Sequence, residues 1–466
     1  MASASMTAAQ RLGQMCADLS WERLPADVGR RAAELTLDHL GVAIRGSTEP
    51  STGPVRAVVS GYLAANGSSA VGVPSRLVPA MAALLNGTAA HAVELDDVTR
   101  ESSLHPGVTV IPAALAVAEQ RDAPGRAFLE AVVAGYEVAI RVGNALNPAS
   151  AYERGFHPTG VAGAFGAAAA AARLMDLDGA GIARALGVAG TMASGSMEYL
   201  SDGSWTKRLT AGWAAHAGVM AAELAAAGFT GPASALEGRF GVLRAYTDAP
   251  RPQLLTEGLG GSHQITRVAI KPYACCRYNH GLIDGTLKIR AEHDVDPSAV
   301  RRIRLGVLSA GASLIAHPIE QKRAPGNPVE AQFSAPFATA IALVFGAAGA
   351  PEYRQRVIDD PRIRALMAIT DCYTSADLDA LYPDRWPAAV EIEMTDGRVY
   401  RTRVEYALGE PENPLSGDAL RHKFRELVGD RLPAVETRRL EDAAMGLHDA
   451  PSVGGLADAL RMVRVG

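Results

Sequence analysis

The stretch GRAFLEAVVAGYEVAIRVGNAL (residues 125–146) decides the fold class of this chain. Its apolar residues recur at three- and four-residue spacing, the pattern of a helix with one buried face. The same period recurs in DVGRRAAELTLDHLGVAIRG (27–46) and TAGWAAHAGVMAAELAAAGF (210–229), and Gly and Pro stand at the ends of these stretches as stop signals. Because the faces of these helices are rich in Ala and Gly, the helices can pack closely. The sequence therefore predicts a large helical bundle.

The pattern changes near residue 265. SHQITRVAIKPY (262–273) and SAVRRIRLGVLSA (298–310) are rich in β-branched residues and partly alternate, which predicts strands. PAAVEIEMTDGRVYRTRVEYAL (387–408) predicts a hairpin, because Asp396-Gly397 separates two alternating runs. Helical periods lie between these strands, near 278–292 and 329–346.

These patterns predict a mainly α protein with two domains. A helical domain covers residues 1–265 and resumes over 409–466, and a smaller α+β domain is inserted at 266–408 as a lid. Ligands favour junctions between domains, so we expect one there. The length of 466 residues suits two or three domains.

Charge and composition exclude several classes of protein. The net charge is −5, the pI is about 6.1 and no basic stripe is visible, so we expect no nucleic-acid partner. The small-residue run that starts at Gly160 is too short to span a membrane, and the first residues lack a signal-peptide pattern. We therefore expect a cytoplasmic protein. Four cysteines without a C-x-x-C pair indicate neither a disulfide framework nor a structural zinc site.

Reactive side chains concentrate in four short stretches at the ends of apolar segments. These are HAVELDDVTRESSLHPG (91–107), GFHPTG (155–160), SDGSWTKRLTAGWAAHAG (201–218) and IKPYACCRYNHG (270–281). Lys and Arg can hold carboxylates, and His or Lys can take a proton from the carbon next to one. No G-x-G-x-x-G after a strand and no Walker motif is present, so no organic cofactor is expected. This combination favours a pocket for a small polycarboxylate.

Other interpretations of these residues stay open. A lone His beside a helix is more often structural than catalytic, and Lys207 with Arg208 fits an exposed pair. Glu94, Asp96 and His105, with Asp97, have oxygen and nitrogen donors for a divalent cation, although their spacing matches no defined metal site. We expect no metal. A non-catalytic protein that retains the fold is a further possibility.

Seven motifs together resemble the MmgE/PrpD family over nearly the whole chain. They are NGTAAHAVELDD, HPGVTVIPAALA, FHPTGVAGAFGAA, SWTKRLTAGWAAHAG, GRFGVLRAY, KPYACCRYNH and NPVEAQFSAPFA. The family includes 2-methylcitrate dehydratase, cis-aconitate decarboxylase and iminodisuccinate epimerase. The resemblance implies a large helical domain with an α+β lid, a homodimer, and catalysis without a metal or organic cofactor.

The resemblance also assigns roles. By likeness His105 and His157 are pocket histidines, Lys207 and Lys271 are pocket lysines, and Glu94 takes the place of the family's acid in the H-x-x-D position. The chain departs from the family pattern here, with Glu for Asp, and it has Cys276 where the decarboxylase has a further His. Our predicted catalytic residues are His157, His105, Lys207, Lys271, Glu94 and Asp96. Our predicted substrate-binding residues are Arg208, Arg277, Thr99, Cys276, His280 and Tyr273.

The resulting hypothesis is a hydro-lyase acting on a 2-methylcitrate-like acid. His157 or Lys207 removes a proton α to a carboxylate, and His105 assists loss of a β-substituent. The same carbanion would serve an epimerase of an iminodisuccinate-like dicarboxylate, and a cis-aconitate-type decarboxylase is the other alternative. Replacement of His157, Lys207 or Lys271 by Ala should remove activity and leave the thermal midpoint nearly unchanged.

Overall fold

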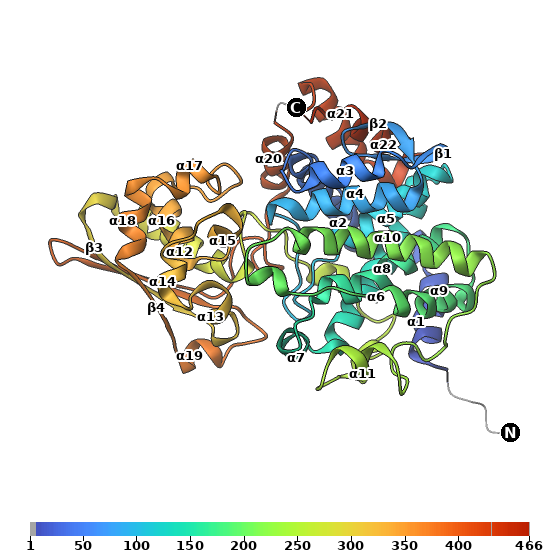
Figure 1. Cartoon of the computed structure of the whole chain (residues 1–466), viewed down its shortest axis with the longest axis horizontal. Coiled ribbons are helices and arrows are strands. Elements are labelled where there is room, and N and C mark those ends of the chain that lie inside the picture. The colour runs from blue at the N-terminus through green and yellow to red at the C-terminus, as the bar shows by residue number, and fades with distance from the viewer. Residues whose placement is uncertain (1–5, 430, 466) are drawn as a thin grey trace. The chain divides into compact units, whose positions relative to one another are not determined.

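The computed structural model describes residues 6–429 and 431–465, which form two compact units (Figure 1). Unit 1 contains the residues up to Ala92, Asp96–Val268, and the chain from Ser416 onward. Unit 2 contains Ala269–Leu415 together with the short segment Val93–Leu95. Most described residues are helical and the sheets are small, so the mainly α class predicted from the sequence is confirmed.

Unit 1 is a bundle of packed helices, and its long helices match the periodic stretches of the sequence. The stretch 125–146 forms one helix from end to end, which follows Pro124 and stops where Asn147 turns into the left-handed region. The α-helices of this unit are α1 (Ala8–Asp18), α2 (Ala26–Gly46), α3 (Thr52–Val59), α4 (Pro79–Ala90), α5 (Gly107–Gln120), α6 (Gly125–Leu146), α7 (Pro148–Glu153), α8 (Pro158–Leu174), α9 (Gly179–Met192), α10 (Thr206–Ala226), α11 (Val242–Tyr246), α20 (Gly417–Val428), α21 (Ala434–Met445) and α22 (Gly454–Arg461).

Small residues set the distances between the central helices. A Cβ atom at Gly166 of α8 would lie 2.6 Å from the carbonyl oxygen of Gly135 on α6. A Cβ atom at Gly218 of α10 would lie 2.3 Å from the Cβ of Ala167 on α8. Both separations are below van der Waals contact, so larger residues at these positions would push the helices apart. The Ala- and Gly-rich faces therefore hold α6, α8 and α10 close together.

Unit 1 is not all helical, which corrects the sequence prediction. β1 (Leu63–Ala70) and β2 (Val73–Leu77) pair as an antiparallel hairpin with Gly72 in the turn at φ 70°. Ser68 and Ser69, near the end of β1, are buried. Their polar groups donate hydrogen bonds to Ala116 and Glu119 of α5. This polar segment lacks the apolar alternation by which a strand is recognised in a sequence.

Unit 2 combines one mixed sheet with short helices. The strand order is β4-β3-β5-β6, with β3 parallel to β4 and the other pairs antiparallel. The predicted strand at 298–310 and the predicted hairpin at Asp396-Gly397 are both present. The elements are α12 (His280–His293), β3 (Val300–Val307), α13 (Ser309–Ile315), α14 (Ile319–Lys322), α15 (Pro328–Gln332), α16 (Ala335–Phe345), α17 (Gln355–Ile358), α18 (Pro361–Ala368), β4 (Thr370–Thr374), α19 (Ala376–Asp379), β5 (Ala388–Met394) and β6 (Val399–Val404).

The strand predicted over 262–273 is wrong. Gln264–Arg267 form a 3-10 turn, and the residues after it run as an irregular buried segment. Ile265, Val268 and Ile270 are all buried, because this segment passes between packed elements and does not present one face to a sheet. Its β-branched composition therefore reflects burial and not strand pairing.

No helix in the described part of the chain is both long and apolar enough to cross a bilayer. Whether unit 2 moves as a lid stays a prediction.

Candidate acid–base site

The loop between α4 and α5 carries the centre of the site. His91 follows directly after α4, and His105 lies two residues before α5. The side chain of Asp97 secures the loop, because it accepts hydrogen bonds from the Gly107 N–H at 2.9 Å and from the Tyr136 hydroxyl at 2.7 Å. Burial is the main cause that raises the pKa of Asp97 to about 7. Asp97 is therefore an anchor of the loop.

One carboxylate oxygen holds two imidazole rings. Asp96 Oδ2 lies 2.8 Å from Nδ1 of His91 and 2.9 Å from Nδ1 of His105. His105 Nδ1 also lies 2.8 Å from the main-chain oxygen of Asp97. Two acceptors at the same nitrogen fit an N–H donor at Nδ1, which places the lone pair of the neutral His105 ring on Nε2. The residues His91, Asp96 and His105 are all buried.

His157 completes the cluster from another helix. It precedes Pro158 at the start of α8, and its main-chain N–H donates to the Gly195 oxygen at 2.8 Å. The His157 ring centroid lies 5.9 Å from that of His91 and 6.4 Å from that of His105. Tyr199 packs edge-on against His157 with a centroid separation of 6.1 Å. The loop and the start of α8 therefore bring three histidines and one carboxylate together.

The first turn of α10 places Lys207 and Arg208 in the interior of unit 1. Both side chains are buried, so the alternative of an exposed pair is wrong. Arg208 donates to the Ser51 hydroxyl at 2.8 Å. α10 packs against α4 and α8, the helices next to His91 and His157. Thr99 is also buried, and its hydroxyl pairs with that of Ser102 within the loop.

In unit 2 the predicted lysine is part of a buried ion pair. Lys271 Nζ lies 3.6 Å from Glu94 Oε2, and both side chains are almost completely buried. Glu94 belongs to unit 2 although Asp96, two residues later, belongs to unit 1. The structure thus gives different partners to two acids that were both predicted to be catalytic. Asp96 holds the imidazoles, and Glu94 balances Lys271.

The remaining predicted residues of unit 2 have partners within that unit. Arg277 donates to Glu410 and its guanidinium lies 5.6 Å from the Trp386 ring centroid. Tyr273 donates to Asp284, and the buried His280 packs edge-on against Tyr273 at 5.2 Å. These contacts are enough to explain Arg277, Tyr273 and His280 as structural residues, so a substrate contact by any of them stays a prediction.

The two adjacent thiols of unit 2 are buried. Burial raises the pKa of Cys275 to about 12, so that thiol stays protonated at neutral pH. Cys276 is also buried, and its main-chain N–H donates to the Gln332 oxygen at 2.9 Å. The predicted contact between Cys276 and a substrate stays a prediction.

His91, Asp96 and His105 also have the donor atoms of a cation site, since their ligand atoms lie within 4.8 Å of one another. The separations of 2.8 and 2.9 Å from Asp96 are those of N–H···O⁻ hydrogen bonds. His105 Nδ1 in addition faces a main-chain oxygen, which suits an N–H and not a lone pair directed at a cation. Hydrogen bonding therefore accounts for the arrangement.

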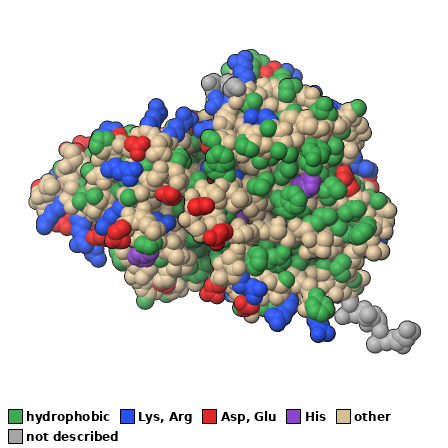
Figure 2. All heavy atoms as spheres, in the orientation of Figure 1, with side chains coloured by type: hydrophobic (Ala, Val, Ile, Leu, Met, Phe, Trp, Pro, Cys, Tyr) green, Lys and Arg blue, Asp and Glu red, His purple; other side chains and the backbone are tan. Residues whose placement is uncertain are grey.

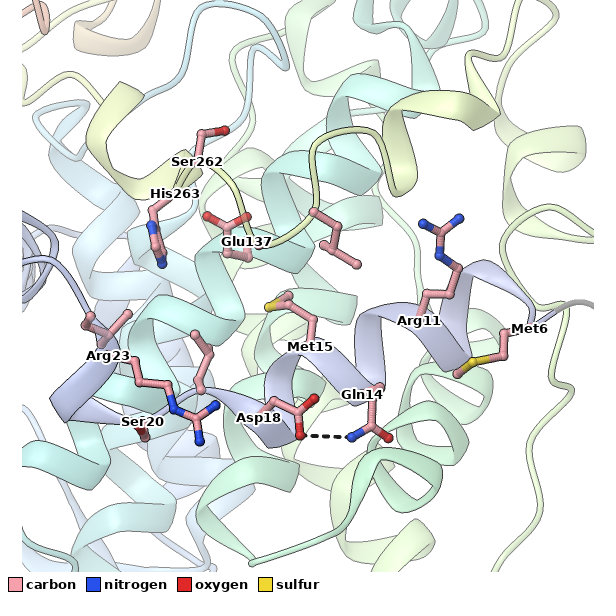
Figure 3. Close-up of a pocket in the computed structure, with 14 residues that line it drawn as sticks. Met6, Arg11, Gln14, Met15, Asp18, Ser20, Arg23, Glu137, Ser262 and His263 are labelled. Atoms are coloured by element: carbon pink, nitrogen blue, oxygen red, sulfur yellow. Dashed lines mark hydrogen bonds between the residues drawn. The ribbon is translucent and has the colours of Figure 1, made fainter.

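A separate pocket of unit 1 contains none of the predicted site residues. It has a volume of about 480 Å³ and lies between α1, the 3-10 turn after it and the segment around Ser262 (Figure 3). Arg11 and Arg23 stand at opposite ends of the drawn pocket, and the Glu137 carboxylate lies between them. Its lining carries both positive and negative side chains and does not suggest one class of ligand.

Comparison with known proteins identifies the family of the chain. The family model of the MmgE/PrpD N-terminal domain matches residues 10–255, and that of the MmgE/PrpD C-terminal domain matches residues 273–449. The chain belongs to the MmgE/PrpD family. The family contains lyases, both dehydratases and decarboxylases, and this supports the lyase prediction without distinguishing between the two reactions.

Three relatives show how far the similarity to named MmgE/PrpD proteins extends. The cis-aconitate decarboxylase-like protein oryM of Aspergillus oryzae is 29% identical over 455 residues, 93% of each chain. The cis-aconitate decarboxylase of Aspergillus terreus is 27% identical over 465 residues, covering 95% of this chain and 94% of that protein. The 2-methylcitrate dehydratase of Salmonella typhimurium is 29% identical over 133 residues, covering 27% of this chain and 28% of that protein.

Two residues of the cluster were missing from the predicted site. His91 stands in the quoted motif NGTAAHAVELDD, but nothing in its spacing shows that its ring meets Asp96 five positions later. Tyr199 is more than 40 residues from His157 in the sequence, and only the packing of the segment after α9 against the start of α8 brings them together. No signal in a single sequence would have identified Tyr199.

Proposed function

We propose that this chain is a lyase that acts on a small polycarboxylate by acid–base catalysis, without a cofactor, with elimination of water as the first candidate reaction. The observation that supports this most directly is the cluster in which His91 and His105 share the carboxylate of Asp96 and lie against the ring of His157. A carboxylate at Nδ1 stabilises the imidazolium that forms when Nε2 holds a proton. Such a pair can donate a proton to a leaving hydroxyl.

The proposed reaction needs a base and an acid on a buried substrate. His157 or Lys207 takes the proton from the carbon next to a carboxylate, and the C–H electron pair becomes the new double bond. The C–O bond to the β-hydroxyl breaks, and His105 Nε2 supplies the proton with which it leaves as water. Groups of this kind typically accelerate a reaction by about 10²- to 10⁴-fold each. Lys271 is proposed to hold a substrate carboxylate.

Decarboxylation is the second candidate, because relatives named cis-aconitate decarboxylase match over 93–95% of this chain. The relatives named 2-methylcitrate dehydratase match a much shorter part of it. The site departs from the decarboxylase pattern at Glu94 and Cys276, which favours dehydration. An epimerase would use the same proton abstraction and return the proton to the opposite face.

Proton NMR in D₂O separates these reactions. The chelator-treated protein is incubated with citrate, 2-methylcitrate, cis-aconitate and amino-dicarboxylates. A new vinylic proton signal from citrate, or conversion of the methyl doublet of 2-methylcitrate into an allylic singlet, establishes dehydration, and loss of CO₂ from cis-aconitate establishes decarboxylation. Exchange of an α-proton without a new compound establishes epimerisation and contradicts both lyase proposals. No change in any spectrum would contradict an acid–base role of the cluster toward these acids.

We further propose that the protein forms a homodimer through the outer face of α10. Trp205, Leu209 and Trp213 are exposed and follow one another at four-residue spacing, so they form a stripe along one side of this helix. Figure 2 shows hydrophobic side chains gathered where α10 runs in Figure 1. Exposed Trp residues in such a patch are typical of protein interfaces.

Light scattering after gel filtration tests the dimer. The double variant Leu209→Glu, Trp213→Glu should elute as a monomer because it places charges in the stripe. Phe240→Glu is the matched control, since Phe240 is 88% exposed but does not lie on α10. A wild-type monomer, or a dimer that survives the double change, contradicts this interface.

A further inference from the structure

His91 makes contacts that the proposed reaction does not use. Its side chain is completely buried, and Nδ1 lies 2.8 Å from Asp96 Oδ2. Its other nitrogen, Nε2, has no hydrogen-bond partner among the described residues. A buried polar atom without a partner costs about 1–3 kcal/mol, so a histidine at this position needs an explanation beyond packing.

His91 contacts both histidines that the proposed reaction uses. Its ring centroid lies 4.9 Å from that of His105, and its ring stacks on His157 at 5.9 Å with an interplanar angle of 20°. His105 and His157 are farther from each other, at 6.4 Å. His91 is therefore the ring that lies closest to both of the others.

We propose that His91 is a positioning residue that shares Asp96 with His105, so that the two imidazoles and one carboxylate titrate as a single unit. The inference rests on the proposed function for its catalytic meaning. The single negative charge of Asp96 can balance one imidazolium. If both rings were protonated, two positive charges would face the same carboxylate oxygen. While His105 carries the acid proton, His91 stays neutral, donates Nδ1–H to Asp96 and keeps that oxygen in place.

The other ionisable groups around this unit leave Asp96 as the carboxylate that the rings share. Burial lowers the pKa of His39 to about 3, so His39 is neutral at physiological pH. Asp38 is balanced by the buried ion pair that it forms with Lys423 of α20. The groups come from α2, the loop itself, α6 and α8, and they are Asp38, His39, Asp97, Tyr136 and His157.

Two substitutions separate the hydrogen bond of His91 from its ring. His91→Asn keeps an N–H donor near the position of Nδ1, and His91→Phe keeps the ring but removes the donor. In His91→Phe more of the Asp96 charge acts on His105, so the pKa of His105 rises. We expect the alkaline limb of kcat/KM against pH to move up by about one unit, and kcat to fall about 10- to 100-fold through lost alignment.

The controls distinguish positioning from mere support of the fold. His91→Asn should restore the wild-type alkaline limb and most of kcat. His216→Asn is the matched substitution outside the cluster, because His216 Nδ1 bonds to the main-chain oxygen of Ala80 at 3.2 Å, and it should leave the limb in place. If His91→Phe lowers the thermal midpoint but leaves the limb within about 0.2 units of wild type, the inference is wrong.

Shared titration can be measured without turnover. Long-range ¹⁵N–¹H spectra of the histidine rings follow His105 between about pH 5 and 9. We expect a two-step curve in the wild type and one step in His91→Asn. A single step in both proteins overturns the inference even if the enzyme is active. Two-step titration in a protein without activity on any acid would instead contradict the proposed function and leave the coupling of His91 to His105 intact.

Discussion

Unit 1 and unit 2 each bury a carboxylate with basic partners, but the two arrangements suit different chemistry. In unit 1 Asp96 accepts from two imidazoles, whose pKa values lie near physiological pH in ordinary surroundings. In unit 2 Glu94 faces the ammonium group of Lys271, so one positive and one negative charge lie together. The first arrangement can exchange protons with little change in net charge. The second is a fixed pair of charges.

This difference shows that burial alone does not identify a catalytic acid. Glu94 and Asp96 are both buried and two residues apart, yet they belong to different units and have different partners. Replacing a carboxylate that orients imidazoles is expected to lower the reaction rate. Replacing a lysine of a buried ion pair is expected to lower the stability of the fold as well. Each expectation can be tested separately.

Asp96→Asn should have the largest effect on rate. An amide oxygen can still accept from both Nδ1–H groups, but it carries no negative charge, so it no longer stabilises the imidazolium that forms when His105 holds the acid proton. We expect kcat to fall by about 10²- to 10⁴-fold, the contribution of a general acid or base. Steady-state kinetics and the rate of α-proton exchange in D₂O measure the loss. If the kcat of the variant is within about tenfold of that of the wild type, the imidazoles do not depend on Asp96, and the proposed contrast between the two units is wrong.

Lys271→Met should have the largest effect on stability. It leaves Glu94 buried without its counter-charge, which typically costs about 3–5 kcal/mol. This revises the expectation from the sequence that replacing Lys271 leaves the thermal midpoint nearly unchanged. Urea denaturation of the single variant and of Lys271→Met with Glu94→Leu measures the pair. The double variant should recover most of the stability and remain inactive if Lys271 holds a substrate carboxylate.

The opposite result would also be informative. If Lys271→Met unfolds at the wild-type denaturant concentration, the two side chains do not act as a charge pair, and the contrast between the units disappears.

Asp97→Asn should have a smaller effect that depends on pH. The pKa of Asp97 is raised in the folded protein to about 7, so the folded state keeps a proton that the unfolded chain loses near pH 4. The stabilisation from this proton is fully present below about pH 4 and is lost as pH rises to about 7, by at most about 1.4 kcal/mol per pH unit. Asn cannot titrate. The stability of the wild type relative to the variant should therefore decline over that range and level off above it.

Chemical denaturation at a series of pH values measures this difference. A constant difference between wild type and Asp97→Asn from about pH 4 to 8 would show that Asp97 stays ionised. The loop anchor in unit 1 would then be a second negative charge beside Asp96, which would sharpen the question of how the imidazoles keep their protons.

Local patterns predicted many elements of the fold correctly. The stretch 125–146 becomes α6, the hairpin at Asp396-Gly397 becomes β5 and β6, and the region 409–466, where the helical domain was predicted to resume, contains α20 to α22. In these cases periodicity and turn chemistry agree with the packing around them. The pattern failed for β1 and for 262–273, where contacts with α5 and burial on all sides decided the backbone. Those contacts join residues far apart in the chain.

The sequence by itself determined the family, the mainly α class and the stretches that carry the reactive residues, because all three depend on residue type at short spacing. Only the tertiary structure decided that His91 shares Asp96 with His105, that Glu94 pairs with Lys271, and that Tyr199 packs on His157. The physical reason is that the backbone conformation sets the direction in which each side chain points. A helix end or a turn at φ 54°, as at Glu94, sends neighbouring side chains to different partners, and the partner is chosen by packing between distant segments.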